Sequence, residues 1–194
     1  MVMRRGSGTR VHLTGEGGFS LLEAIVVATV VGLLGAMVVP VTTGMIARAK
    51  AEGSTLAAVT ALQSARNRAV AERRNFHLYF DQSVHKIRIE RVEPGGSRTV
   101  IANLNLENGL KFEKFSALPD TPDLFGNATA VTFGGTAPVM FTSDGTLIDD
   151  NGDVVNGSLF LGVPQQKATA QAITFFGPTG LIRTWRWGGS KWLE

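Results

Sequence analysis

The hydrophobic pattern divides the chain into an apolar run, an amphipathic stretch and a long region of short alternating runs. No charged residue occurs in the 24 positions from Ala24 to Ala47. At about 1.5 Å per helical residue this run extends roughly 36 Å, enough to cross a hydrocarbon core of about 30 Å. One carboxylate, Glu23, stands at the start of the run. The pattern predicts a membrane-spanning helix headed by an ionisable group, which needs a partner or a purpose.

The next stretch, up to about residue 74, is one-sided. Apolar residues recur every three to four positions, as on one face of a helix: Leu56, Val59, Leu62, Ala65, Ala69 and Val70. Six basic residues and two acids fill the remaining positions, which is more typical of a solvated helix face than of a nucleic-acid patch. The apolar face must be covered, and the β-rich remainder of the chain is the expected cover.

After Arg74 the pattern changes to short β-favouring runs separated by turn residues. We expect strands at residues 76–80, 86–92, 99–106, 110–115, 130–133, 139–142, 146–148, 158–163, 172–176 and 181–187, with a surface loop at 116–129. Hairpin turns that need positive φ favour Asp-Gly and Asn-Gly, found at 144–145, 151–152 and 156–157. The short spacing favours packed antiparallel sheets. The expected fold class is α+β, a long N-terminal helix packed on an antiparallel β-sheet domain.

A short basic leader, with Arg4, Arg5 and Arg10, precedes the apolar run and ends in a glycine pair. In an ordinary secretory signal the apolar region comes before the cleavage site, whereas here it follows the glycines. Without residues 1–18, Lys+Arg falls from 19 to 16 and Asp+Glu from 16 to 15, so the net charge falls from +3 to +1. The overall charge therefore argues little about partners.

This order resembles the type IV prepilin signature, in which a hydrophilic leader ends in glycine and is followed by phenylalanine and, at the fifth position, by glutamate. Here these residues are Gly18, Phe19 and Glu23, and Pro40 falls at the twenty-second position, where that superfamily has proline. The resemblance implies that prepilin peptidase cuts between Gly18 and Phe19 and N-methylates Phe19. The alternative is an uncut signal-anchor helix whose Glu23 lies among the lipid headgroups.

The resemblance implies four parts: a leader at 1–18, a transmembrane assembly helix at 19–47, an amphipathic extension at 48–74 and a periplasmic β-rich domain at 75–194. It implies a single-pass inner-membrane protein with a cytoplasmic N-terminus, later extracted into a fibre. In the family the glutamate pairs with a neighbouring subunit's terminal amine, which is cationic near neutral pH. Glu23 would have this role. Pro40 is expected to bend or locally melt the helix, as it also would in a plain anchor.

Three further segments resemble the H-type pseudopilins and minor pilins of the GspH/FimT family. They are an Ala-Arg-x-x-Ala helix end at 65–69, a Phe-x-x-x-Gly stretch at 141–145 and a closing Gly-x-x-Arg hairpin at 180–183. The resemblance implies a pilin-like fold and a structural subunit of a type II secretion pseudopilus or a type IV pilus, at or near the tip. Its partners would be other minor pilins or pseudopilins and the major subunit. Both systems use the same leader and helix, so both assignments stay open.

The C-terminal strand carries the chain's unusual composition, since all three tryptophans lie in the last ten residues. By strand alternation Arg183 shares a face with Trp185 and Trp187. Arginine near exposed aromatic rings binds single-stranded nucleic acid through phosphate contacts and base stacking. Arg183, Trp185 and Arg186 are therefore candidate nucleic-acid-binding residues of a minor pilin that acts in DNA uptake. The alternative is a strand whose tryptophans seal the domain or dock on a neighbouring subunit.

Neither a cofactor nor a metal site is predicted. The chain has no cysteine, which excludes disulfides and thiolate metal sites. The turn at 149–153 clusters oxygen ligands without EF-hand spacing, so we expect a solvated turn, with a calcium loop as the alternative. His77 and His85 are expected to be ordinary strand residues, because metal binding would need a third ligand. No nucleophile elbow, phosphate-binding loop or zinc-protease motif occurs, so we expect no enzyme activity.

Overall fold

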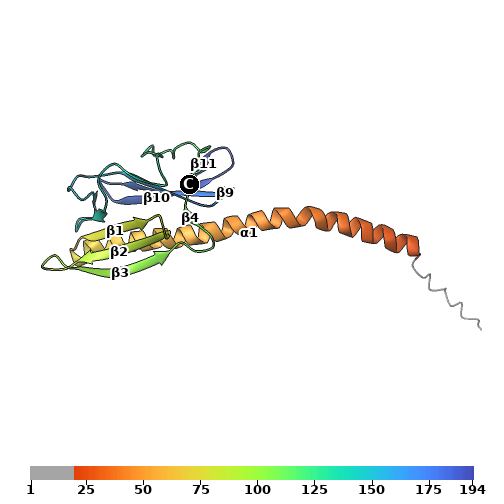
Figure 1. Cartoon of the computed structure of the whole chain (residues 1–194), viewed down its shortest axis with the longest axis horizontal. Coiled ribbons are helices and arrows are strands. Elements are labelled where there is room, and N and C mark those ends of the chain that lie inside the picture. Colours follow the sequence, from red (N-terminus) through yellow and green to blue (C-terminus); the bar gives the residue numbers. More distant parts are fainter. Residues whose placement is uncertain (1–19) are drawn as a thin grey trace, which may run out of the picture. The chain divides into compact units, whose positions relative to one another are not determined.

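The computed structural model describes residues 20–194, and for residues 36–43 it describes the backbone alone. The chain divides into two compact units, Met1–Thr42 and Thr43–Glu194. Helix α1 (Leu21–Glu72) contributes to both (Figure 1). The predicted cleavage residues Gly18 and Phe19 lie outside the described residues, as does the side chain of Pro40, whose backbone is helical.

Five strands form the first antiparallel sheet of the second unit, in the order β3-β2-β1-β6-β7, and Figure 1 shows β1, β2 and β3 side by side. They are β1 (Phe76–Asp81), β2 (Lys86–Val92), β3 (Arg98–Asn105), β6 (Val139–Phe141) and β7 (Leu147–Ile148). β1 and β2 make the expected hairpin. β6 then pairs with the first half of β1, joining segments that lie far apart in the sequence.

Six strands form the second sheet, in the order β11-β10-β9-β8-β4, with β5 also paired to β8. They are β4 (Lys111–Phe112), β5 (Val131–Phe133), β8 (Gly157–Val163), β9 (Gln166–Phe176), β10 (Leu181–Trp187) and β11 (Trp192–Leu193). β5 and β4 share one edge of β8, β5 along its first residues and β4 along its last. The predicted strands are therefore present, although β4 is shorter and β9 longer than expected, and β11 was not predicted.

The prediction of a hairpin turn at Asn156-Gly157 is wrong. Gly157 is the first residue of β8, and only the other two predicted turn glycines, Gly145 (φ 87°) and Gly152 (φ 90°), have positive φ. A Cβ on Gly157 would lie 2.1 Å from a ring carbon of Phe133 on β5. Glycine is needed here for close approach of an aromatic ring, rather than for its backbone freedom.

The main core lies between α1 and the inner faces of both sheets. The buried helix positions recur at three- and four-residue spacing: Ala51, Thr55, Ala58, Leu62, Ala65 and Ala69. Leu56 and Val70, predicted on this face, are 65% and 45% exposed, because they lie off the stripe that faces the sheets. Small residues predominate on the stripe, which lets the helix approach the sheets closely.

A second hydrophobic cluster covers the outer face of the second sheet, and it contains Leu118, Phe160, Ala170, Ala172, Trp185, Trp187 and Trp192. Strand β8 is consequently buried on both faces along six of its seven residues. A strand that is buried on both faces has a continuous apolar sequence instead of alternating apolar and polar residues. This two-sided burial positions the residues of the C-terminal strand discussed below.

Candidate functional site

The first turn of α1 holds the acidic group of the apolar unit. The Ser20 hydroxyl oxygen accepts a hydrogen bond from the N–H of Leu22 (3.2 Å), so Ser20 is the N-cap. Glu23 is then the third helical residue, where a carboxylate interacts favourably with the positive end of the helix dipole. Among residues 20–194, Glu23 forms no ion pair. Its charge is thus available to a partner outside the described chain.

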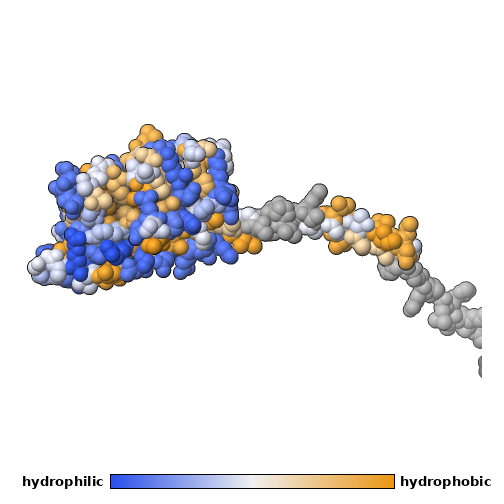
Figure 2. All heavy atoms as spheres, in the orientation of Figure 1, coloured by the Kyte–Doolittle hydropathy of each residue, from blue (hydrophilic) through white to orange (hydrophobic). Residues whose placement is uncertain are grey.

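The helix that follows Glu23 is exposed at every position through residue 35, and the face seen in Figure 2 is largely apolar. Leu21 is 80% exposed, and Val31 and Leu33 are more than half exposed. A helix that is apolar all round requires lipid or other helices as cover. Within the residues whose side chains are described, no helical stretch has the length and apolarity of a membrane span.

Arg66 of α1 joins two turns of the β domain that are distant in sequence. Its Nε donates to the carbonyl oxygen of Gly145 (3.3 Å), and its Nη2 donates to that of Thr179 (2.7 Å). Gly180, beside Thr179, has φ 61°, and a Cβ there would lie 2.0 Å from the Gly145 carbonyl oxygen. The contact therefore requires glycine at this turn.

The three segments that resemble the H-type proteins meet at this contact. Arg66 comes from the segment at 65–69, Gly145 ends the segment at 141–145 and Gly180 begins the segment at 180–183. Their common role is structural, because together they attach the helix end to two hairpin turns. No chemistry beyond hydrogen bonding follows from these groups.

Arg48 makes an equivalent contact near the start of the second unit. Its Nε donates to the carbonyl oxygen of Ala168 and its Nη2 to that of Trp187, both at 3.1 Å. The expectation of a solvated basic face is therefore wrong for Arg48 and Arg66: the Arg48 guanidinium reaches carbonyls of β9 and β10, and that of Arg66 reaches carbonyls of two turns. Several donors in a planar fork allow arginine to bond more than one carbonyl at once.

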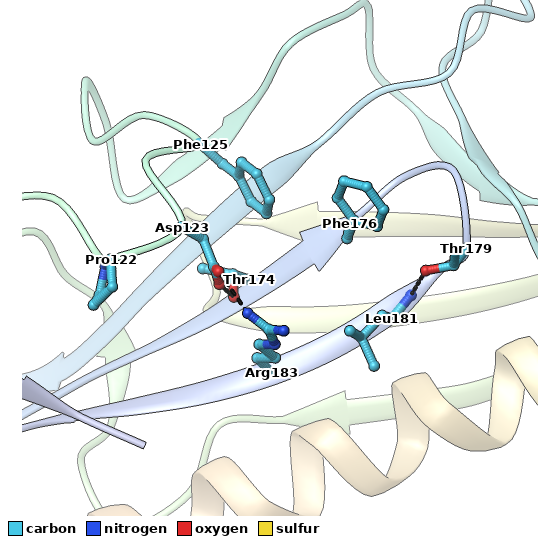
Figure 3. A pocket seen from close by; sticks show the side chains of 8 residues that line it. All are labelled: Pro122, Asp123, Phe125, Thr174, Phe176, Thr179, Leu181 and Arg183. Atoms are coloured by element: carbon cyan, nitrogen blue, oxygen red, sulfur yellow. Dashed lines mark hydrogen bonds and ion pairs between the residues drawn. The ribbon is translucent and has the colours of Figure 1, made fainter.

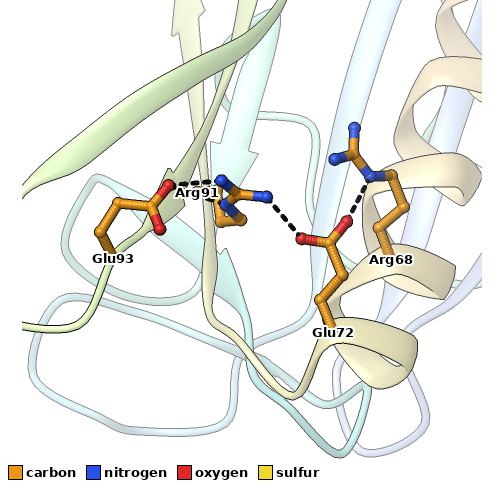
Figure 4. Close-up of polar contacts among 4 residues, drawn as sticks. All are labelled: Arg68, Glu72, Arg91 and Glu93. Atoms are coloured by element: carbon orange, nitrogen blue, oxygen red, sulfur yellow. Dashed lines mark hydrogen bonds and ion pairs between the residues drawn. The ribbon is translucent and has the colours of Figure 1, made fainter.

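An ion-pair chain ties the C-terminal turn of α1 to β2 (Figure 4). Arg68 Nε and Arg91 Nη1 each lie 2.8 Å from a carboxylate oxygen of Glu72, and Arg91 Nη2 lies 2.6 Å from Glu93. Hydrogen bonds from Arg91 and then Arg68 hold the pKa of Glu72 below its usual range. The two arginines also offset the unfavourable position of a carboxylate at the negative end of a helix.

Asp123, from the loop at 116–129, connects three residues on the outer face of the second sheet, and Figure 3 shows two of them, Thr174 and Arg183. Its Oδ2 accepts hydrogen bonds from Thr174 Oγ1 (2.6 Å) and Trp185 Nε1 (3.1 Å), and its Oδ1 accepts one from Arg183 Nη1 (2.9 Å). A groove of about 500 Å³ adjoins this cluster. Asp123 therefore fixes the loop on β9 and β10 and neutralises the charge of Arg183.

The tryptophans of the C-terminal strands are buried, with Trp185 8%, Trp187 6% and Trp192 7% exposed. Trp192 Nε1 donates to the carbonyl oxygen of Pro119 (3.0 Å), and the rings of Trp187 and Trp192 meet edge to face with centroids 5.4 Å apart. Base stacking needs an exposed ring face. This burial favours the role of sealing the domain.

The two arginines proposed to bind nucleic acid do not lie together. Arg183 and Arg186 are three positions apart on β10, and alternation directs them to opposite faces of the sheet. Arg183 lies beside Asp123, whereas Arg186 lines a cavity with Glu52 and Leu56 of α1. One strand of nucleic acid would not reach both from one face.

The turn at 149–153 is built around Asp149. Its Oδ1 accepts hydrogen bonds from the N–H groups of Asn151 (3.0 Å) and Asp153 (2.9 Å), and its Oδ2 accepts one from the N–H of Thr136 (2.9 Å). The hydrogen bond from Thr136, followed by those from Asp153 and Asn151, lowers the pKa of the Asp149 carboxyl. Both oxygens thus already serve the turn. Among the residues described, no three His, Asp or Glu side chains are grouped to hold a metal ion.

The two histidines of the β domain, His77 and His85, have different environments. His77 is buried in β1, and its Nδ1 has no hydrogen-bond partner among the described residues. His85, expected in a strand, lies instead in the β1–β2 turn with φ 51°. Burial, reinforced by the charge of Arg98, lowers the pKa of the His77 imidazole.

We expect the buried imidazole of His77 to make the fold less stable in mild acid. Because the folded-state pKa is below the unfolded value of about 6.5, the unfolded chain binds more protons in this range. The contribution of the neutral His77 imidazole to the free energy of unfolding is therefore fully present above about pH 6.5 and is lost as the pH is lowered toward 5. Urea unfolding of the full chain in a nonionic detergent should show this loss. In the His77→Gln variant the free energy of unfolding should depend less on pH over the same range. Equal slopes for the two proteins would contradict the assignment.

Sequence reasoning did not identify Asp123 or Arg66 as structural centres. Asp123 stands in an irregular loop with two prolines, one glycine and a second carboxylate, Asp120, and nothing in the sequence pattern distinguishes it. One signal was present: a buried tryptophan needs a partner for its N–H, which implies an acceptor near Trp185. The acceptor itself comes from 62 residues away.

The comparisons with known proteins concern the fold. No protein-family model and no curated protein matches the sequence. The minor pseudopilin EpsH of the Vibrio cholerae type 2 secretion system is similar in structure, with a TM-score of 0.51 and 14% identity, over 72% of this chain and 98% of that chain. A second EpsH structure has a TM-score of 0.48 and 13% identity, over 74% and 99% of the two chains. The Pseudomonas aeruginosa type IV minor pilin FimU has a TM-score of 0.46 and 17% sequence identity, over 80% of this chain and 98% of that chain.

The similarity to the first EpsH structure confirms the expected α+β, pilin-like fold. Nearly the whole of that chain is matched. At 14% identity the comparison concerns the fold and does not extend to individual residues.

Proposed function

We propose that this protein is a minor pilin or pseudopilin, a structural subunit of a type II secretion pseudopilus or a type IV pilus and not an enzyme. The observation that carries the proposal is the exposed apolar helix, with the single carboxylate Glu23 in its first turn. Such a helix requires cover by lipid before assembly and by other helices afterwards. The pilin-like fold supports the same role, since EpsH is described as a minor pseudopilin.

In this proposal prepilin peptidase removes residues 1–18 and N-methylates Phe19. The chain then crosses the inner membrane once, with its β domain in the periplasm. Cleavage frees the amine of Phe19, and Glu23 pairs with that amine on a neighbouring subunit. The pairing offsets the cost of a carboxylate in an apolar helix and sets the axial register between subunits. Residues 19–47, including Pro40, provide the helix that packs in the fibre.

The proposed place of the subunit is at or near the fibre tip, beside other minor subunits and above the major subunit. The β domain would then present its surface to neighbouring subunits. Its own hydrogen bonds attach the helix to both sheets through Arg48 and Arg66. Such internal attachment suits a part that must keep its shape while it is extracted from a membrane.

We expect the protein isolated from cell membranes to begin at Phe19, with a methyl group on its amine. Mass spectrometry of the intact protein and of its N-terminal peptide measures both. In cells that lack prepilin peptidase the same protein should begin at its original terminus. A product that starts anywhere other than Phe19 in normal cells would overturn the proposed processing.

The alternative is a minor pilin that binds DNA through Arg183, Trp185 and Arg186. The burial of Trp185 and the ion pair of Arg183 with Asp123 favour the structural role instead. We expect no DNA gel shift at low salt, and no difference between the protein and its Arg183→Ala/Arg186→Ala variant. A salt-dependent shift that the double variant loses would favour DNA binding.

A further inference from the structure

Strand β1 pairs with β6 over only half of its length. The paired residues are Phe76–Leu78 with Val139–Phe141, and Pro138 precedes the last pair. Proline has no N–H to donate, and the chain before it leaves the sheet. Within residues 20–194, no strand continues beside Tyr79–Asp81 on this side.

The backbone groups of Phe80 face the open side. The N–H of Val92 donates to the carbonyl oxygen of Asn75 (2.9 Å), so the backbone of residue 75 faces β2. Because successive residues of an antiparallel strand direct their N–H and C=O to alternate sides, those of Phe80 face the opposite edge. This edge is an unfinished ladder, with a donor and an acceptor in position for another strand.

A groove of about 620 Å³ lies along this edge, between β1 and the segment that includes Phe133 and Pro138. The rings of Phe80 and Phe133 are stacked, with centroids 5.4 Å apart. Val131 and Pro138 extend the apolar lining. The groove thus offers apolar contacts on its core side next to free main-chain groups.

The other side of the groove is basic. Lys86 and Arg88 line it, and the Arg88 guanidinium lies over the Tyr79 ring, 4.6 Å from its centroid, so it extends across β1. Arg88 Nε is 3.0 Å from Glu90, which leaves its other N–H groups for a further partner. Asp81 also lines the groove, and its Oδ1 accepts hydrogen bonds from the N–H (2.9 Å) and the hydroxyl (2.6 Å) of Ser83; with two cations against this one carboxylate, the lining keeps a net positive charge.

We propose that this groove binds an extended segment of another polypeptide, which adds as a strand to the free edge of β1 and alternates apolar with acidic residues. The apolar side chains would contact Phe80 and Phe133, and the acidic ones would meet Lys86 and Arg88. At about 3.3 Å per strand residue the three free residues extend about 10 Å, so a segment of five residues covers the edge with about one residue beyond each end. The proposal rests on this geometry alone and does not require that the protein assembles into a fibre.

The probe is a fluorescein-labelled, C-terminally amidated peptide, Val-Glu-Val-Glu-Val, titrated with the full chain in nonionic detergent and followed by fluorescence anisotropy. We expect it to bind at least about tenfold more tightly than Val-Lys-Val-Lys-Val, because charge-assisted bonds are among the stronger polar contacts. Equal affinity for the two peptides, or no binding of the acidic peptide at millimolar protein, would overturn the proposal.

Two N-methylated forms of the acidic peptide test strand pairing, one methylated at odd and one at even positions. Only one set of N–H groups faces β1, so one form should lose at least about tenfold in affinity and the other should stay close to the parent. Unchanged binding of both forms would mean that the main chain is not involved, which the proposal excludes.

The variant Lys86→Glu/Arg88→Glu should lose the preference for the acidic peptide, with circular dichroism checking that its fold is kept. Lys50→Glu/Lys191→Glu is the matched control, because it makes the same change of net charge at two exposed residues outside the groove, one on α1 and one in the turn between β10 and β11. The proposal predicts unchanged affinity for this control. If both variants weaken binding equally, the attraction is a property of overall charge and the groove is not the site.

Discussion

Replacing Glu23 by alanine should leave the protein in the membrane but abolish its incorporation into a fibre. On insertion scales a central carboxylate costs roughly 2.5–3.5 kcal/mol, and less near a helix end, so its removal does not hinder insertion. Assembly, in contrast, loses the partner of the Phe19 amine and with it the axial register. Membrane fractionation and immunoblotting of sheared fibres measure the two effects separately.

Glu23→Gln distinguishes charge pairing from helix capping. The Ser20–Glu23 spacing is also that of a capping box, in which glutamine serves as well as glutamate. If Glu23 acts through its charge, the glutamine variant should fail to assemble as completely as the alanine variant. If glutamine restores assembly, the role of Glu23 is local to the helix start and the proposed pairing is wrong.

Replacing Gly180 by alanine should destabilise the β domain by about 3–5 kcal/mol. Left-handed backbone costs a non-glycine residue roughly 1–2 kcal/mol. A Cβ would also lie 2.0 Å from the Gly145 carbonyl oxygen and 2.7 Å from Arg66 Nε. The two turns must separate, which breaks the hydrogen bonds that Arg66 donates. The loss in the free energy of unfolding is measured by urea unfolding of the full chain in detergent, monitored by tryptophan fluorescence.

Gly96→Ala is the matched control for this prediction. Gly96 also has positive φ, 87°, but a Cβ there would meet no atom within 4 Å. Its replacement should therefore cost only the backbone strain, about 1–2 kcal/mol. Equal losses at the two glycines would show that the contact between Arg66 and the turns yields easily, and that it does not secure the helix end.

The local patterns predicted most elements because each depends on neighbours in the sequence. The apolar run, the helical spacing after it and the β-favouring runs follow from side-chain periodicity, which tertiary contacts rarely reverse over long segments. Where packing from both sides replaced alternation, as in β9, the boundary was less accurate: the strand begins at Gln166, six residues before the predicted start at Ala172. Gly157 is the clearest case, since its neighbour Phe133 is distant in sequence and converts an expected turn into the start of a strand.

The candidate site was predicted unevenly for the same reason. Sequence alone determined where the acidic group stands in the helix and which segments resemble the H-type proteins. Only the tertiary structure decided that Arg66 bonds carbonyls 79 and 113 residues away, that Asp123 neutralises Arg183 across 60 residues and that half of β1 has a free edge. Spacing along a chain is set by covalent geometry, whereas the pairing of a charge or a strand edge is set by packing between distant segments.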